Sequence, residues 1–180
     1  MTAHRPSVIV MYHFFYPDDV VSARHFSQFA EELVKHGWHV TILTSNRFCR
    51  NTKKKIVKRD ELWRGMKIIR IRRPAWNQAK GFLRLANSAW LMLSWSLEIC
   101  KLPRADVIIV GSDPQFSALL FPVFRALKRG KLLVHWCFDL YPDAIIADGA
   151  KGSVRWFAEK LAFLMRWAYR SVDLMVDIGP

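Results

Sequence analysis

The sequence predicts a doubly wound α/β domain, in which a mainly parallel, Rossmann-like sheet of about six strands carries helices on both faces. Short apolar runs alternate with longer helical patterns, and several of the runs are apolar at nearly every position. Strands of that kind are typical of a parallel sheet that is covered on both sides. We therefore expect one Rossmann-like domain over residues 1–180.

The expected strands are short runs rich in β-branched residues, and helical patterns connect them. The first helix has apolar residues at steps of three and four and ends at Gly37. The connection over 45–66 has no clear pattern, and long loops of this kind are usually functional or mobile. The strands are predicted at 8–15, 39–44, 67–72, 106–110, 132–138 and 173–178, and helices at 23–36, 114–128 and 153–171.

Two further helices are rich in aromatic residues. Segment 81–100 contains an uncharged run over 85–97, which is too short to span a bilayer, so it is either a buried core helix or an interfacial segment. The helix over 153–171 shows two stripes. We expect the first to face the core and the second to face lipid headgroups, to contact a partner protein or to snorkel over the edges of the core. The first holds Val154, Phe157, Leu161, Leu164 and Ala168, and the second Trp156, Lys160, Phe163, Trp167 and Arg170.

The charge is strongly positive and unevenly placed. The formal net charge is +13, and segment 47–73 holds twelve Lys and Arg against only Asp60 and Glu61. Such a patch attracts anionic lipid surfaces or nucleic acid, and it is also compatible with a merely solvated loop. The three cysteines form no CxxC pair, so neither a disulfide framework nor a zinc site is indicated, and a reducing cytosol fits best.

Several enzyme classes lose support because their motifs are missing from the sequence. There is no GxxxxGK[ST] phosphate loop, no GxGxxG fingerprint, no HExxH zinc motif and no GxSxG nucleophile elbow. ATPases, ordinary NAD enzymes and the corresponding hydrolases are therefore disfavoured.

The candidate site lies beyond the carboxyl ends of the strands, where the strand order reverses and neighbouring loops diverge. The loops after the first and fourth strands, 16–23 and 111–115, are polar and lead into helices, and the fifth strand ends in Asp139 and Asp143 with Tyr141 between them. Carboxylates there can accept protons from sugar hydroxyls, although Asp before a helix is as often an N-cap. His13 and His25 flank the first loop as further candidates, whereas His135 is read as a satisfied core imidazole.

The order of short motifs along the chain resembles the start of family-4 glycosyltransferases. The motifs are Phe-Tyr-Pro at 15–17, Ser-Ala-Arg at 22–24, His-Gly-Trp-His-Val-Thr at 36–41, Gly-Ser-Asp-Pro at 111–114 and Asp-Leu-Tyr-Pro-Asp at 139–143. The last one resembles the corresponding turn of the polysaccharide-assembly branch. Family-4 glycosyltransferases are retaining enzymes of the two-lobed B-type fold, and they transfer sugar from a nucleotide donor without a required metal.

The resemblance implies that the chain is the N-terminal, acceptor-side half of such an enzyme. The C-terminal donor-binding domain and its Glu-x7-Glu motif do not follow within the 180 residues, so we expect the isolated chain to be inactive. The alternative is a non-catalytic subunit that anchors a separate donor-binding chain at the membrane. Asp139 is the candidate catalytic residue. The candidate acceptor-binding residues are Tyr16, Asp18, Asp19, Ser22, Arg24, Asp113, Gln115, Tyr141 and Asp143.

The expected partners are a nucleotide sugar, bound as substrate and not as cofactor, and a glycan or polyprenyl-linked acceptor. We expect no cofactor and no metal. The basic and Trp-rich segments predict peripheral binding at the inner face of the cytoplasmic membrane, and nucleic-acid binding is the weaker alternative because aromatics are not interleaved with the basic cluster. The candidate membrane-surface residues are Lys53, Lys54, Lys55, Lys58, Trp90, Trp95, Trp156 and Trp167.

Overall fold

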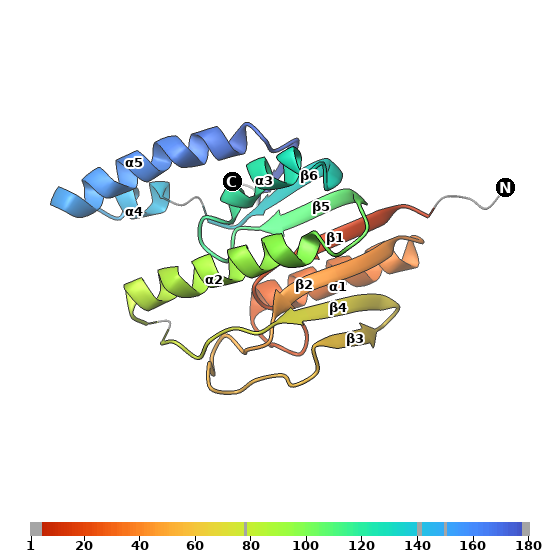
Figure 1. Cartoon of the computed structure of the whole chain (residues 1–180). Coiled ribbons are helices and arrows are strands. Elements are labelled where there is room, and N and C mark those ends of the chain that lie inside the picture. The colour runs from red at the N-terminus through yellow and green to blue at the C-terminus, as the bar shows by residue number, and fades with distance from the viewer. Residues whose placement is uncertain (1–4, 78, 140–141, 150, 178–180) are drawn as a thin grey trace.

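The computed structural model describes residues 5–77, 79–139, 142–149 and 151–177. In this part of the chain seven strands form one sheet in the order β3-β4-β2-β1-β5-β6-β7, and every neighbouring pair except β3 with β4 is parallel (Figure 1). The predicted doubly wound α/β fold is confirmed. The strands are β1 (Ser7–Met11), β2 (His39–Ser45), β3 (Asp60–Trp63), β4 (Met66–Ile71), β5 (Ala105–Gly111), β6 (Gly130–Cys137) and β7 (Leu174–Asp177).

Helices cover both faces of the sheet, and each face has its own apolar core. On one face α1 packs Phe26 and Ala30 against β1, β2 and β4. On the other face the central strands contact Trp95 from α2, Phe121 from α3 and Met165 from α5. The helices are α1 (Val21–Lys35), α2 (Gly81–Ile99), the 3-10 turn η1 (Ser117–Leu119), α3 (Leu120–Ala126), α4 (Asp143–Ala147) and α5 (Gly152–Tyr169).

Strand β3 was not predicted, and it lies within the stretch expected to be unpatterned. It pairs antiparallel with β4 through a two-residue turn in which Arg64 and Gly65 both have positive φ, as a hairpin of this kind requires. The strand is short, charged at Asp60 and Glu61, and exposes Leu62. An edge strand with these features has no apolar alternation by which to recognise it.

Two helical predictions need correction. Only 120–126 of the helix expected over 114–128 is α-helical, and η1 precedes it. In α5 the expected core stripe is only partly right: Ala168 is buried and Leu161 packs against the core, but Val154, Phe157 and Leu164 are exposed. The buried face consists instead of Ala158, Ala162, Met165 and Ala168. The small alanines let the helix approach α3 and η1 closely, and this brings their face inward in place of the bulkier one.

Helix α2 is a core helix along one face only, so the structure leaves room for an interfacial role of its other faces. One of its faces, with Leu91, Trp95 and Ile99, is buried against the sheet, while Phe82, Leu93 and Leu97 on other faces are exposed. No helix in the described ranges is long and apolar enough to cross a membrane.

Candidate functional site

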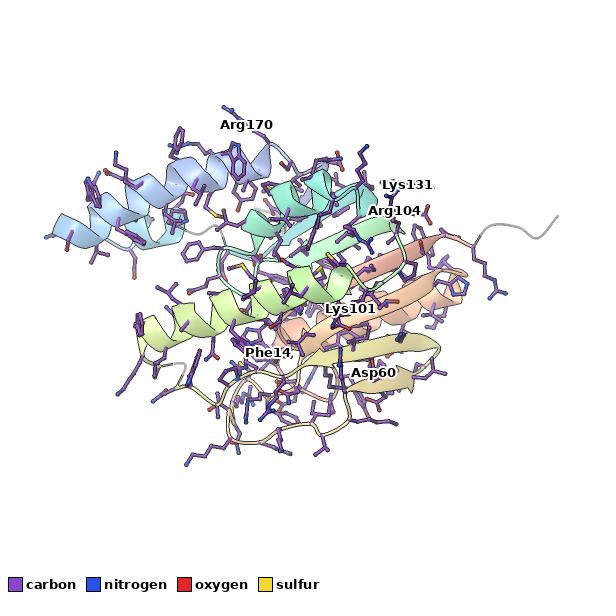
Figure 2. All side chains as sticks on the ribbon, viewed as in Figure 1. Phe14, Asp60, Lys101, Arg104, Lys131 and Arg170 are labelled. Carbon is purple, nitrogen blue, oxygen red and sulfur yellow. The ribbon has the colours of Figure 1, made fainter. Side chains whose placement is uncertain are left out.

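A cleft of about 290 Å³ opens at the carboxyl edge of the sheet, where β1 and β5 lie side by side and their following loops diverge. Figure 2 places Phe14 at this edge, whereas Arg104 and Lys131 lie at the opposite, amino-terminal end of the strands. The cleft is lined by Tyr12, His13, Phe14, Cys49, Arg84, Ser88, Ser112, Asp113, Gln115, Phe138 and Asp139.

An imidazole and a carboxylate meet in the wall of this cleft. His13 Nδ1 lies 3.0 Å from Asp113 Oδ1, and the imidazole is almost completely buried. Among the described residues, His13 Nε2 has no hydrogen-bond partner. The two loops that the sequence predicted to flank a crevice are thus joined by their own side chains.

Tyr12 forms the floor of the cleft, and Gly111 makes room for it. The Tyr12 ring stacks on Phe26 with centroids 4.1 Å apart. A Cβ added at Gly111 would meet Tyr12 Cδ2 at 2.3 Å, so only glycine fits there. Burial, followed by the charge of Asp113, raises the pKa of the Tyr12 phenol above its usual range, and Ser22 hydrogen-bonds to it. The floor is therefore a neutral phenol.

Ser112 fixes the segment that carries Asp139. The Ser112 hydroxyl accepts hydrogen bonds from the backbone N–H groups of Phe138 at 3.0 Å and Asp139 at 3.4 Å, and its own N–H donates to the carbonyl of Trp136. The loop after β6 is thereby held against the loop after β5. Asp139 reaches the cleft with an exposed side chain.

Cations gather beside the cleft. Arg84 lines it from the first turns of α2, and the guanidinium of Arg73 lies 5.8 Å from the centre of the Phe14 ring. Arg73 is completely buried, and none of its guanidinium nitrogens has a hydrogen-bond partner in the described part of the chain. Burial lowers the pKa of Arg73 to about 10, and the nearby charge of Asp113 opposes this shift. The group still carries its charge at neutral pH.

The loop after β2 closes one side of the site. Asp18 Oδ2 accepts a hydrogen bond from the backbone N–H of Cys49 at 2.6 Å, which ties this loop to the loop after β1. The Cys49 thiol is half-buried at the cleft wall, and burial, with the charges of Asp18 and Asp113, raises its pKa.

The structure brings together three of the residues predicted from sequence for the site: Asp113, Gln115 and Asp139 all line the cleft. The others that the structure describes do not line it. Asp18 holds the Cys49 loop, Tyr16 stacks on Trp63 with centroids 4.2 Å apart, and Asp19 contacts Arg50 at 3.4 Å. Tyr141 lies outside the described residues, and the remaining positions away from the cleft wall are Ser22, Arg24 and Asp143.

Other lining residues escaped the sequence prediction. Arg84 and Ser88 come from a helix that showed only apolar character, and Cys49 comes from the unpatterned loop. Nothing in their local sequence indicates that these segments reach the crevice. His13 was one of two further candidate histidines that flank the first loop, and the structure places it in the cleft wall, just after β1.

Most of the candidate membrane-surface residues are exposed. This holds for the tryptophans at 90, 156 and 167, and for the lysines at 53, 54, 55 and 58. The prediction for Trp95 is wrong, because this side chain is completely buried between α2 and the sheet and cannot contact a membrane surface. The exposed basic segment also borders a second hollow of about 540 Å³, which Arg47, Lys55 and Arg59 help to line.

A comparison of the chain with protein families finds a match over most of its length. The model of a family described as "Glycosyl transferase 4-like domain" matches residues 22–177, which is most of the chain. The chain belongs to this family. The cleft residues after β2, β5 and β6 thus lie within the matched segment of a glycosyltransferase 4-like domain.

A comparison with solved structures supports the same fold. The catalytic domain of starch synthase IV from Arabidopsis thaliana, bound to ADP and acarbose, is similar to this glycosyltransferase-like domain with a TM-score of 0.53 and 13% identity. The match covers 76% of this chain and 34% of the starch synthase chain, so the domain spans about a third of that structure. No curated protein sequence matches significantly. Among the described residues no group of three or more His, Cys, Asp or Glu side chains could hold a metal ion.

Proposed function

We propose that this domain is the acceptor-side half of a glycosyltransferase that moves a sugar from a nucleotide-sugar donor to a lipid-linked or other glycan acceptor. The observation that carries the proposal is the cleft itself, in which His13, Asp113 and Asp139 converge at the carboxyl edge of a family-4-like domain. Carboxylate and imidazole groups at such an edge can bind and deprotonate sugar hydroxyls.

In this proposal Asp139 is the catalytic residue that faces the reacting centre, and Asp113 and Gln115 shape the acceptor pocket. Asp139 is exposed within the cleft, which leaves its carboxylate available to a substrate. The residues of the first loop, from Tyr16 to Arg24, act behind the cleft wall instead of in it. Asp18 is the clearest case, because its carboxylate is already engaged by the backbone of Cys49.

We propose that a second lobe completes the site and binds the nucleotide, and that residues 1–180 alone do not transfer sugar. The match covers only 34% of the similar starch synthase chain, which is more than twice as long as residues 1–180. The second lobe is supplied either by the same polypeptide or by a partner chain. In the second case this domain is the membrane-anchoring subunit of a split enzyme, and the lobe travels with it on purification.

We also propose that transfer retains the configuration of the donor sugar, as the resemblance to family-4 enzymes implies. Proton NMR of the first-formed product reports this directly, because the anomeric coupling constant of the product is compared with that of the donor. Inversion of the configuration would contradict this part of the proposal.

The site is proposed to work at an anionic membrane, at the inner face of the cytoplasmic membrane. Two exposed surfaces support this: the basic loop with Lys53, Lys54 and Lys55, and the aromatic faces of α2 and α5 with Trp90 and Trp156. Lysine near a charged bilayer contributes about 1 kcal/mol per residue, and tryptophan is favoured at headgroup depth.

A sedimentation experiment tests the membrane proposal. The chain is mixed at low and high salt with vesicles of phosphatidylcholine alone, or of phosphatidylcholine with added anionic phosphatidylglycerol. We expect binding only to the anionic vesicles, with release at high salt because surface charges are then screened. Replacing Lys53, Lys54, Lys55 and Lys58 by Ser should weaken the binding. Equal sedimentation with both vesicles, or tighter binding to random oligonucleotides than to vesicles, would contradict the membrane proposal.

A transfer assay tests the catalytic proposal. Membranes from cells that express the protein from its own locus are supplied with uridine- and guanosine-diphosphate sugars and a polyprenyl-diphosphate-linked monosaccharide. We expect sugar transfer that depends on the locus and falls with Asp139→Asn, while His25→Gln, an exposed change on α1, leaves it unchanged. Transfer that is unaffected by deletion of the locus would refute the proposed function.

A further inference from the structure

A basic hollow of about 540 Å³ lies between the loop that follows β2 and the end of β4, and it shares no lining residue with the cleft. The loop and the segment after β4 lie at the same end of the sheet (Figure 1). Among the described residues that line the hollow there is no carboxylate, whereas five are cations. These are Arg47, Lys55, Arg59, Arg70 and Arg72. The hollow is therefore strongly positive.

Two of the five cations are compensated by acidic side chains. The guanidinium of Arg59 lies 2.9 Å from a carboxylate oxygen of Glu98, and that of Arg70 lies 2.6 Å from Glu61. The other three cations have no acidic partner within the described ranges. Uncompensated like charges around one hollow repel each other, and an anion in the hollow would relieve this repulsion.

The walls of the hollow are held in place by hydrogen bonds between the loop and the end of β4. The N–H of Asn46 donates to the carbonyl of Ile71 at 3.0 Å, and the carbonyl of Asn46 accepts from the N–H of Ile56 at 2.8 Å. Arg47 Nε donates to the carbonyl of Arg73 at 2.6 Å. The hollow is therefore formed before any ligand binds, as is usual for ligand sites.

An exposed apolar stripe on α2 borders the hollow. It consists of Trp90, Leu93 and Leu97, which recur at helical spacing and are all exposed. The indole N–H of Trp90 donates to the carbonyl of Arg72 at 2.9 Å, so the stripe begins directly beside a residue of the hollow. Val57, in the lining itself, is 85% exposed. A cationic site and an apolar surface thus adjoin, which suits an amphiphilic ligand.

We propose that the hollow binds the terminal phosphate of a membrane lipid, whose chain lies along the stripe on α2. Lys55 and Arg72 donate charge-assisted hydrogen bonds to the phosphate oxygens, and Arg47 adds a third positive charge. Both donors are exposed, so the phosphate reaches them from solvent. This inference rests on the membrane part of the proposed function, and it adds the lipid group that is bound and the place that binds it.

The charge of the ligand and its apolar part distinguish it from other anions. A terminal phosphate carries about −1.5 to −2 at neutral pH, whereas a phosphodiester carries one negative charge, so the terminal group matches the uncompensated cations better. Nucleic acids stack their bases on aromatic rings and gain little from the two leucines of the stripe. A lipid uses both surfaces.

Sedimentation of the full chain with two kinds of vesicle tests the headgroup. Phosphatidic acid presents a terminal phosphate, and phosphatidylglycerol presents a phosphodiester. Both are mixed with phosphatidylcholine to give the same surface potential. We expect the chain to bind the phosphatidic acid vesicles about tenfold more tightly, because hydrogen bonds to the terminal phosphate add to the general attraction. Equal binding to the two vesicles would overturn the proposal.

Two double variants separate the hollow from the general charge of the loop. Lys55→Gln with Arg72→Gln removes two exposed charges from the lining, and Lys53→Gln with Lys58→Gln removes two exposed charges from the same loop outside it. The first pair should abolish the preference for phosphatidic acid. The second should weaken binding to both vesicles and keep the preference. Equal effects of the two pairs would show diffuse attraction in place of a site. Thermal unfolding confirms that both variants fold.

Soluble probes decide between a lipid and a free phosphate as the source of the bound group. Dihexanoyl phosphatidic acid and glycerol 3-phosphate have the same phosphate, but only the first has chains. By calorimetry we expect the lipid to bind at least about tenfold more tightly, because its chains bury apolar surface on the stripe. Leu93→Ser with Leu97→Ser should remove this difference. Equal affinities, or tighter binding of a random oligonucleotide or a phosphoserine peptide, would refute the lipid site.

The failure of this inference and that of the proposed function are distinguishable. If the chain sediments with anionic vesicles but shows no preference for phosphatidic acid, the hollow proposal fails while the membrane part of the proposed function stands. If it sediments with neither vesicle, the membrane part fails and the lipid site fails with it. Sugar transfer has its own assay, and its outcome is scored separately.

Discussion

Two buried imidazoles lie close to the central strands, and their surroundings give them different properties. His13 faces the cleft with one nitrogen unpaired among the described residues. His135 on β6 bonds through Nδ1 to the carbonyl of Val110 at 3.0 Å and packs between the rings of Phe121 and Tyr169. Burial lowers the pKa of His135 to about 4, so its ring stays neutral as the core imidazole that the sequence predicted.

The low pKa of His135 makes stability depend on pH. Its pKa is near 6.5 in the unfolded chain and about 4 in the fold, so the unfolded state binds the proton more tightly between these values. We expect His135 to make its whole contribution to the free energy of unfolding above pH 6.5. As the pH drops to 4, the free energy of unfolding should fall by up to about 3 kcal/mol. Urea denaturation across this range measures it. His135→Phe should lack this contribution, and an unchanged slope in that variant would refute the assignment.

Gly111 is a second position at which a single added atom is expected to change the stability of the fold. In Gly111→Ala the new Cβ would overlap the ring of Tyr12, which cannot retreat because it is stacked on Phe26. We expect a loss of about 1–3 kcal/mol of stability from overpacking. Gly81→Ala is the matched control, since it meets nothing within 4 Å at the start of α2 and should be neutral or stabilising. Thermal unfolding of both variants would show whether Gly111 tolerates a methyl group after all.

The candidate site could be predicted from the sequence only where it follows the strand ends. Asp113 and Asp139 come directly after β5 and β6, so the rule that ligands bind at the carboxyl edge found them. Arg84 reaches the same cleft from α2, and Arg73, from the chain after β4, is buried beside Phe14, so their places depend on how separate layers pack. Spacing along the chain carries no information of that kind.

At the scale of single elements, helix α2 packs against the sheet on one face and is exposed on another. Trp95 is buried with Leu91 and Ile99 against the sheet, whereas Trp90 is partly exposed and its indole N–H donates to the carbonyl of Arg72 at 2.9 Å. The uncharged run at 85–97 made this helix look uniformly apolar, and only the structure shows which of its tryptophans faces outward.

The two tryptophans of α2 should therefore respond oppositely to substitution. Trp95→Ala removes a completely buried ring and should lower stability by about 3–5 kcal/mol. Trp90→Ala should cost less than about 1 kcal/mol, since the hydrogen bond is at the surface, and should weaken binding to anionic vesicles. Chemical denaturation and vesicle sedimentation of both variants make the comparison. Equal destabilisation by both would contradict the orientation of α2.

Elements were predictable to different degrees for physical reasons. The parallel strands β1, β2, β5 and β6 are apolar because helices cover both of their faces, and this left a clear signal in the sequence. Strand β3 has no such cover and gave none. The core face of α5 was misassigned in part because this helix carries apolar residues on every side. Periodicity alone therefore did not select the alanine face that packs.

At the scale of the whole molecule, the sheet has a protected centre and two different edges. Strand β1 is paired on both sides, with β2 and β5, and is buried on both faces. The edge strands are β3, which carries charges, and β7, whose residues are all exposed. The expected centre of the doubly wound sheet is thus also its most enclosed part.

Hydrogen exchange should reproduce this gradient. We expect amides of β1 and β5 to exchange only through global unfolding, and those of β3 and β7 at least about a hundredfold faster through local opening. Mass spectrometry after timed deuteration measures the difference. If β7 were as protected as β1 in the isolated chain, its exposed surface would have to be covered by a second copy. Dilution would then increase its exchange.

The Cys49 thiol lies in the cleft wall, so its alkylation can report whether a molecule occupies the cleft. Thiol alkylation requires the thiolate, and burial raises the pKa of both Cys49 and Cys137, while Cys100 is exposed. Iodoacetamide should thus label Cys100 first, Cys49 next and Cys137 last. A molecule that occupies the cleft would shield Cys49 and leave the labelling of Cys100 unchanged. Occupancy can then be read by peptide mass fingerprinting before any substrate of the protein is known.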